Sequence, residues 1–164
     1  MSADYESKGY FSEEELKDDM PPGELLKRKK TAVVECLQSI PCNACLHACK
    51  FSALKKGDIN EPPKVDWEKC NACLQCIREC PGLAMFVLTI KDGKAQITIP
   101  WEMPYVPKVG DTVDVLDRKG GRIGRGAIVR VVPPIKKNKT YLVTLETDEK
   151  LVTKARNFRR KPDA

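Results

Sequence analysis

The chain has 164 residues, of which 41% are hydrophobic and 6% aromatic, so it can form one domain or two small ones with a modest core. Residues 1–20 are polar and acidic, and no apolar run is long enough for a signal peptide or a membrane span, so we expect a soluble cytoplasmic protein. The net charge of +6 is uneven: residues 1–30 carry −2, residues 31–86 carry 0 and residues 87–164 carry +8. This contrast predicts more than one domain.

The first 30 residues are interpreted as an N-terminal arm. Ser12 and Glu15 have the spacing of a capping box and predict a short helix over residues 13–19. A Pro-Pro-Gly break at residues 21–23 separates this helix from the basic stretch 24–30. Two interpretations of the arm stay open: a solvated surface tail, or a docking arm for a partner subunit.

Residues 31–99 are predicted to form the second unit. A β-prone run at 31–35 leads directly into the first cysteine. Residues 85–90 and 95–99 are extended segments on either side of an Asp-Gly turn within residues 91–94, which predicts a β-hairpin.

Residues 109–164 follow a proline-rich link and are predicted to form a small basic β-barrel domain that resembles the SH3-like class. Short alternating segments separated by glycine-rich turns indicate this arrangement. The glycines at 124 and 126 suggest a bulge or a sharp bend. The predicted strands cover residues 111–116, 123–132, 140–145 and 150–153. The overall expectation is an α+β protein with a cysteine-rich domain before the barrel.

All eight cysteines lie between residues 36 and 80, in two groups of four. The second group reads Cys70-x2-Cys73-x2-Cys76-x3-Cys80-Pro81. This spacing resembles the complete ligand run of bacterial ferredoxins, in which three thiolates converge on a cluster from one tight loop. The first group has a longer first gap and lacks the final proline. It reads Cys36-x5-Cys42-x2-Cys45-x3-Cys49-Lys50. At four thiolates per cluster, the sequence predicts two iron–sulfur clusters with no cysteine left over.

Other uses of the cysteines are weaker explanations. Two four-cysteine zinc sites could be built from the same residues, but zinc does not require the full ferredoxin spacing. Disulfides are not expected in the cytoplasm. His47 and Lys50 lie among the ligands in sequence. A surface histidine in such a loop is seldom a ligand, and Lys50 is more simply a solvated charge than a residue that tunes a cluster.

Residues 31–86 resemble a bacterial ferredoxin with two [4Fe–4S] clusters. The resemblance implies crossed ligation, in which the last cysteine of each group binds the other group's cluster. One cluster would then be held by Cys36, Cys42, Cys45 and Cys80. The other would be held by Cys70, Cys73, Cys76 and Cys49.

The sequence of residues 36–45 also resembles that of the small iron–sulfur subunits of FAD-dependent amine or imino-acid dehydrogenases, of the proline or hydroxyproline type. In those subunits a ferredoxin segment precedes a β-rich extension. The resemblance implies an electron-transfer subunit that carries electrons between a flavin on a partner subunit and a downstream acceptor protein. A stand-alone ferredoxin, or a ferredoxin subunit of another oxidoreductase, is the alternative.

A metal-containing nucleic-acid-binding protein is the contrasting class, because the +8 C-terminal part could attract phosphates. Few aromatic residues are present there to stack on bases. The sequence shows no nucleophile–base pair, phosphate loop or dinucleotide motif, so we expect no substrate chemistry from this chain alone. We expect residues 109–164 to serve in docking, and their removal to leave both clusters intact, since every cysteine lies before residue 81.

Overall fold

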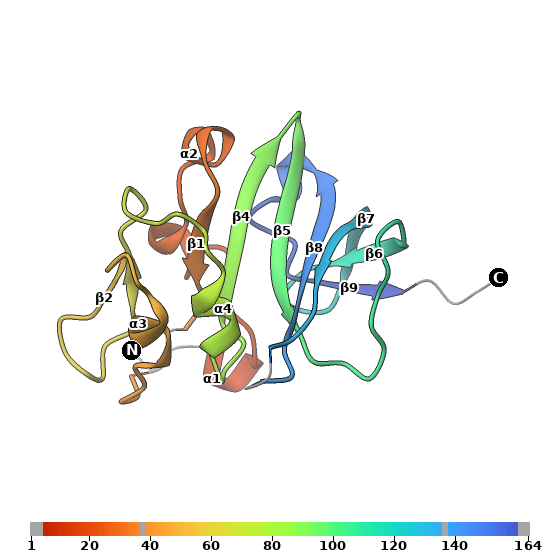
Figure 1. Ribbon diagram of the computed structural model, residues 1–164. Coiled ribbons are helices and arrows are strands. Elements are labelled where there is room, and N and C mark those ends of the chain that lie inside the picture. The colour runs from red at the N-terminus through yellow and green to blue at the C-terminus, as the bar shows by residue number, and fades with distance from the viewer. Residues whose placement is uncertain (1–4, 37–38, 136–137, 161–164) are drawn as a thin grey trace.

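The computed structural model describes residues 5–36, 39–135 and 138–160. Its strands form one seven-stranded sheet in the order β1-β4-β5-β8-β7-β6-β9 and a two-stranded sheet of β2 and β3. In Figure 1 the cysteine-rich segments lie on one side of β4, and β6 to β9 lie on the other. The helical elements are α1 (Tyr5–Lys8), η1 (Lys17–Asp19), α2 (Gly23–Arg28), α3 (Ala44–Ala48), α4 (Gln75–Glu79) and η2 (Glu149–Leu151). The strands are β1 (Thr31–Val34), β2 (Leu54–Lys55), β3 (Lys64–Val65), β4 (Met85–Lys91), β5 (Lys94–Trp101), β6 (Thr112–Leu116), β7 (Arg122–Val132), β8 (Tyr141–Asp148) and β9 (Asn157–Arg160).

The described part of the N-terminal arm is packed against the protein and is not a solvated tail. The capping box forms as expected, with the Ser12 amide donating to Glu15 Oε2 at 2.7 Å. The short helix predicted over residues 13–19 forms only in its last three residues, as the 3₁₀ helix η1, and residues 13–16 form turns. Leu16 and Leu26 are fully buried, which explains why the arm is held in place.

The cysteine-rich unit is a repeat with an offset of 31 residues. Helix α3 begins at Ala44 and α4 at Gln75, and each contains the third cysteine of its group. Strand β1 pairs with β4. Strands β2 and β3, which lie between them in the sequence, pair with each other. The two helices lie beside each other, so the repeat brings the two cysteine groups together.

The hairpin predicted over residues 85–99 is confirmed as β4 and β5. Asp92 and Gly93 both have left-handed backbone conformations, with φ of 51° and 71°, as a two-residue type I′ turn requires. A strand register in which Val87 faces Thr98 and Ile90 faces Ala95 follows directly from this turn.

Strand β8 joins the C-terminal part to this hairpin along the whole length of β5. The pairing runs from Lys94 opposite Asp148 to Trp101 opposite Tyr141. The SH3-like barrel is not confirmed, because the described strands form an open sheet that continues from the cysteine-rich unit. The strand predicted over residues 150–153 is wrong: Asp148 caps η2 there by accepting from the Lys150 amide at 3.1 Å. The last strand is instead β9, which pairs with β6.

Two apolar cores lie on opposite faces of the large sheet. Alternation along β4 places Phe86, Leu88 and Ile90 in one core and Met85 and Val87 in the other. The first core also contains Val113 and Val115 of β6 and Phe158 of β9. The second core contains the cysteines and also Leu142 of β8, which is fully buried. Residues 109–164 therefore help to enclose the cysteines, and this argues against the expectation that they could be removed without harm.

Candidate iron–sulfur centre

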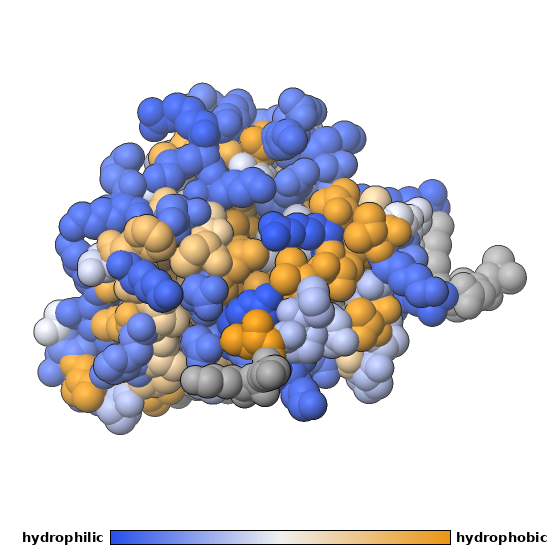
Figure 2. Space-filling model, viewed as in Figure 1, coloured by the Kyte–Doolittle hydropathy of each residue, from blue (hydrophilic) through white to orange (hydrophobic). Residues whose placement is uncertain are grey.

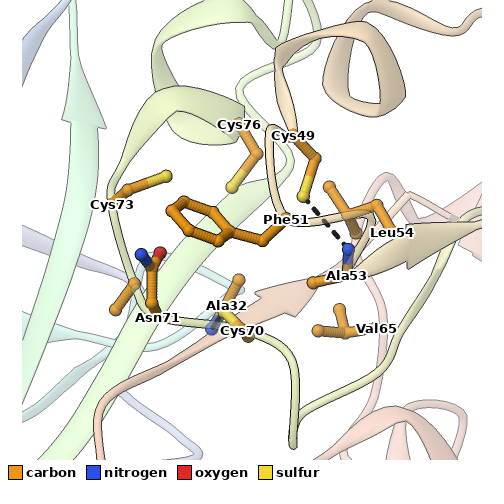
Figure 3. Close-up of a pocket in the computed structure, with 11 residues that line it drawn as sticks. Ala32, Cys49, Phe51, Ala53, Leu54, Val65, Cys70, Asn71, Cys73 and Cys76 are labelled. Carbon is orange, nitrogen blue, oxygen red and sulfur yellow. Dashed lines mark hydrogen bonds between the residues drawn. The ribbon is translucent and has the colours of Figure 1, made fainter.

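One cavity is lined by four cysteines, one from the first group and three from the second. Cys49 comes from the end of the first group, and Cys70, Cys73 and Cys76 come from the second group. Figure 3 shows their side chains arranged around the ring of Phe51, with Ala32 and Leu54 also at the wall. The cavity contains about 350 Å³ of space free of atoms, part of it open to solvent. These are the four residues that the crossed assignment gives to one cluster, and that ligand assignment itself stays a prediction.

The remaining four cysteines are less completely described. Cys42 and Cys80 are close enough to Cys45 for their charges to act on it. Cys36 packs against the same core but also lines a separate cleft that Trp67 shares. Residues 37 and 38, in the long first gap, lie outside the described part of the chain. The structure therefore brings Cys42, Cys45 and Cys80 close together, with Cys36 packed against the same core.

Backbone amides in the described part of the chain donate hydrogen bonds to cysteine sulfurs. Ala53 donates to Cys49 Sγ at 3.3 Å, and Ala84, at the equivalent place in the repeat, donates to Cys80 Sγ at 3.4 Å. Ala32 of β1 donates to Cys70 Sγ, also at 3.3 Å. Such donors stabilise negative charge on a thiolate, and hydrogen bonds to sulfur are one of the means by which a protein sets a cluster's potential.

The loops that hold the cysteines have unusual backbone conformations. Ala72 and Leu74, between the ligand candidates of the second group, have φ of 54° and 70° although neither is glycine. Ser52 and Leu83 follow the last cysteine of each group by three residues and have φ of 51° and 53°. Left-handed conformations of this kind cost free energy and tend to occur at functional sites. Ser52 and Leu83 are equivalent positions of the repeat, so the chain turns in the same way after the last cysteine of each group.

Burial makes the free thiols weak acids. The pKa of Cys76 is raised to about 12, first by burial and then by the neighbouring thiols of Cys70 and Cys73. The pKa of Cys45 is raised to about 11, first by burial and then by Cys80 and Cys42. A group of buried thiolates is therefore unfavourable by itself, and bound cations such as iron would remove the penalty.

The donor set fits an iron–sulfur cluster. Four thiols, amide donors and an apolar wall surround the cavity. Among the residues that the structure describes, no three His, Cys, Asp or Glu side chains gather closely enough to share one metal ion. In a cubane each thiolate binds a different iron, so the ligands surround the cluster instead of meeting at one ion. When bound, such a cluster accepts and releases one electron at a time. His47 and Lys50 are exposed and do not line the cavity.

A buried ionic network next to Cys36 was not expected from the sequence. The Glu35 carboxylate accepts from Arg118 Nη2 at 2.6 Å and from Arg156 Nε at 2.5 Å. Burial lowers the pKa of Arg156 to about 10, which still leaves it charged at neutral pH. The network ties the end of β1 to the segments before β7 and β9. Arg118 and Arg156 are 83 and 121 residues away from Glu35 in the sequence, so no local sequence pattern could have predicted these contacts.

A second unexpected contact joins α4 to the connection between β7 and β8. Both terminal nitrogens of Arg78 donate to the Pro133 carbonyl at 3.2 Å, and Asn138 Nδ2 donates to the Arg78 carbonyl at 2.7 Å. Arg78 lies between two cysteines of the second group in sequence. The C-terminal part thus contacts both ends of the cysteine-rich unit.

Comparison with known proteins supports an iron–sulfur site in the second half of the repeat. Residues 63–86 match the 4Fe-4S binding domain family Fer4. No curated protein and no solved structure matches the chain at a significant level. No helix within the described ranges is long and apolar enough to cross a membrane. Residues 63–86 are therefore a 4Fe-4S binding domain, which supports a role in electron transfer.

Proposed function

We propose that this chain is an electron-transfer subunit that holds two [4Fe–4S] clusters and carries electrons between a flavin on a partner dehydrogenase and a downstream acceptor. The observation that carries the proposal is the cavity lined by Cys49, Cys70, Cys73 and Cys76, because it unites a cysteine of the first group with three of the second. This combination is what crossed ligation requires.

The internal repeat supports a second cluster. The amide of Ala84 donates to Cys80 as that of Ala53 donates to Cys49, so the sulfurs at the ends of both groups have the same backbone support. Cys80 also raises the pKa of Cys45, and this closeness of the last cysteine of the second group to the first group supports crossed ligation. Each group thus contributes its last thiol to the other group's surroundings.

The flavoprotein partner is proposed from the resemblance of residues 36–45 to small subunits of amine and imino-acid dehydrogenases. The test is anaerobic co-purification of the tagged chain from its native cells, followed by flavin analysis of the proteins retained. Addition of proline or hydroxyproline should then bleach the visible absorbance of the clusters. Retention without any flavoprotein would favour the stand-alone ferredoxin alternative, and reduction only by other substrates would contradict the proposed dehydrogenase class.

A further inference from the structure

A groove lined by two cations lies beside the loop that carries Cys73. It crosses strands β4, β5, β8 and β7 and contains about 630 Å³ of space free of atoms, part of it open to solvent. Lys30 comes from the segment just before β1, and Arg130 comes from β7. Both side chains are exposed, and within the described residues neither forms an ion pair. We call this feature the basic groove.

The polar floor of the basic groove can donate hydrogen bonds to an anion. Thr98 and Thr144 lie opposite each other on β5 and β8 and share one hydrogen bond of 2.9 Å. A hydroxyl has one hydrogen, so the pair uses one and leaves the other for a ligand. Thr89 instead donates to the Leu26 carbonyl. Two cations above a remaining hydroxyl donor are suited to a carboxylate.

The basic groove and the cysteine cavity share a wall. Ala72 lines both, and Leu74 lines the groove. Cys73 stands between these two residues and is the one exposed cysteine of the eight. Phe51, at the mouth of the cysteine cavity, is also 46% exposed. The apolar residues around α3 and α4 face the viewer in Figure 2, whereas hydrophilic residues cover α2 and the hairpin tip.

We propose that the basic groove docks an acidic segment of a redox partner protein, so that electrons enter or leave at the cluster held by Cys49, Cys70, Cys73 and Cys76. This inference rests on the proposed function. Electron transfer weakens steeply with distance, so the cluster whose ligand loop reaches the surface is the favoured point of exchange. Opposite charge steers the partner to that loop, and Phe51 adds an apolar contact. Among the described residues that line the groove, none has an aromatic side chain on which a base could stack, which favours a protein over RNA.

The test uses two small one-electron oxidants of opposite charge. Photoreduced protein is mixed in a stopped-flow instrument with ferricyanide, an anion, or with tris(phenanthroline)cobalt(III), a cation, at low ionic strength. Arg130→Glu should slow oxidation by ferricyanide about tenfold and speed oxidation by the cobalt complex, and Lys30→Glu should do the same. Arg125→Glu is the matched control, because Arg125 is an exposed cation on the same strand and lies outside the basic groove. It should change either rate less than about twofold.

A competition experiment identifies the class of partner. Poly-L-glutamate should slow oxidation of the wild-type protein by ferricyanide and have little effect on Arg130→Glu. Equal responses of Arg130→Glu and Arg125→Glu would overturn the inference, as would stronger competition by poly(U) than by poly-L-glutamate. If the purified protein carries no cluster absorbance, the proposed function fails and the groove proposal fails with it. Clusters that react equally well with the anionic and the cationic oxidant would contradict only the groove proposal.

Discussion

Replacing Glu35 by Gln tests whether the C-terminal part supports the cysteine-rich unit. The side chains of Glu35, Arg118 and Arg156 are 7%, 8% and 4% exposed, so their charges are held in the interior. The variant keeps the shape of Glu35 but leaves two buried guanidinium groups without a counter-charge. Removing one member of such a network typically destabilises a protein by about 3–5 kcal/mol.

The variant should therefore unfold at a lower denaturant concentration. With a slope of about 2 kcal/mol per molar urea, the expected loss moves the midpoint down by roughly 1.5–2.5 M. The assay is anaerobic urea unfolding at pH 7, followed by circular dichroism and by visible absorbance. Asp114→Asn is the control, because Asp114 pairs with Arg122, which is half exposed, and a pair of that kind contributes about 0–1 kcal/mol.

The stability difference between wild type and Glu35→Gln should also depend on pH. Burial raises the pKa of Glu35, but the charges of Arg156 and Arg118 lower it by more, so the pKa lies below the ordinary value of 4.5. A carboxylate with a depressed folded-state pKa stabilises the protein above its unfolded pKa, and that contribution is lost as the pH falls through the folded value. The difference should be constant from about pH 6 to 8 and should shrink below about pH 4.5. A midpoint shift no larger than that of Asp114→Asn, at pH 7, would refute the reasoning.

Three further predictions test other parts of the account. Cys80→Ser should remove the cluster assigned to the first cysteine group and spare the other, as read by EPR of the reduced protein, and loss of the second-group cluster alone would contradict crossed ligation. Gly126→Ala places a methyl group 2.5 Å from a carbonyl oxygen of β8 and should destabilise the protein by about 1–3 kcal/mol in thermal unfolding. Gly82→Ala is the control: its methyl group meets nothing within 4 Å, so the variant should be nearly as stable as wild type. Trp67→Phe removes a buried indole N–H that has no partner among the described residues, so it should destabilise less than Trp101→Phe, which breaks a 2.7 Å hydrogen bond to a backbone carbonyl. The opposite order of melting temperatures would show that Trp67 has a partner when the protein is loaded.

The local features of the chain could be predicted from its sequence. Asp92 and Gly93 specify a type I′ turn by their backbone preferences, and the hairpin follows. The cysteine spacing identifies an iron–sulfur site because few other metal sites require three thiols from one tight loop. Both features depend on residues that are neighbours in the chain.

The long-range features could not be predicted. Pairing of β5 with β8 depends on segments about 50 residues apart, and neither strand's alternation reveals which strand lies beside it. Strand β9 was missed because Asn157–Arg160 contains two arginines, which are tolerated there because the strand lies at the sheet edge beside β6. Lys150 to Thr153 has the alternation of a strand, but the side chain of Asp148 favours a 3₁₀ turn instead.

The central claim is that two clusters are held by eight thiols, and the most direct test is the metal and sulfide content of anaerobically purified protein. The account predicts about eight iron and eight acid-labile sulfide per chain, with visible thiolate-to-iron absorbance and no stoichiometric zinc. Zinc in place of iron would contradict it, and so would about four iron and four sulfide per fully loaded chain, since half of the cysteines would then have no cluster to bind.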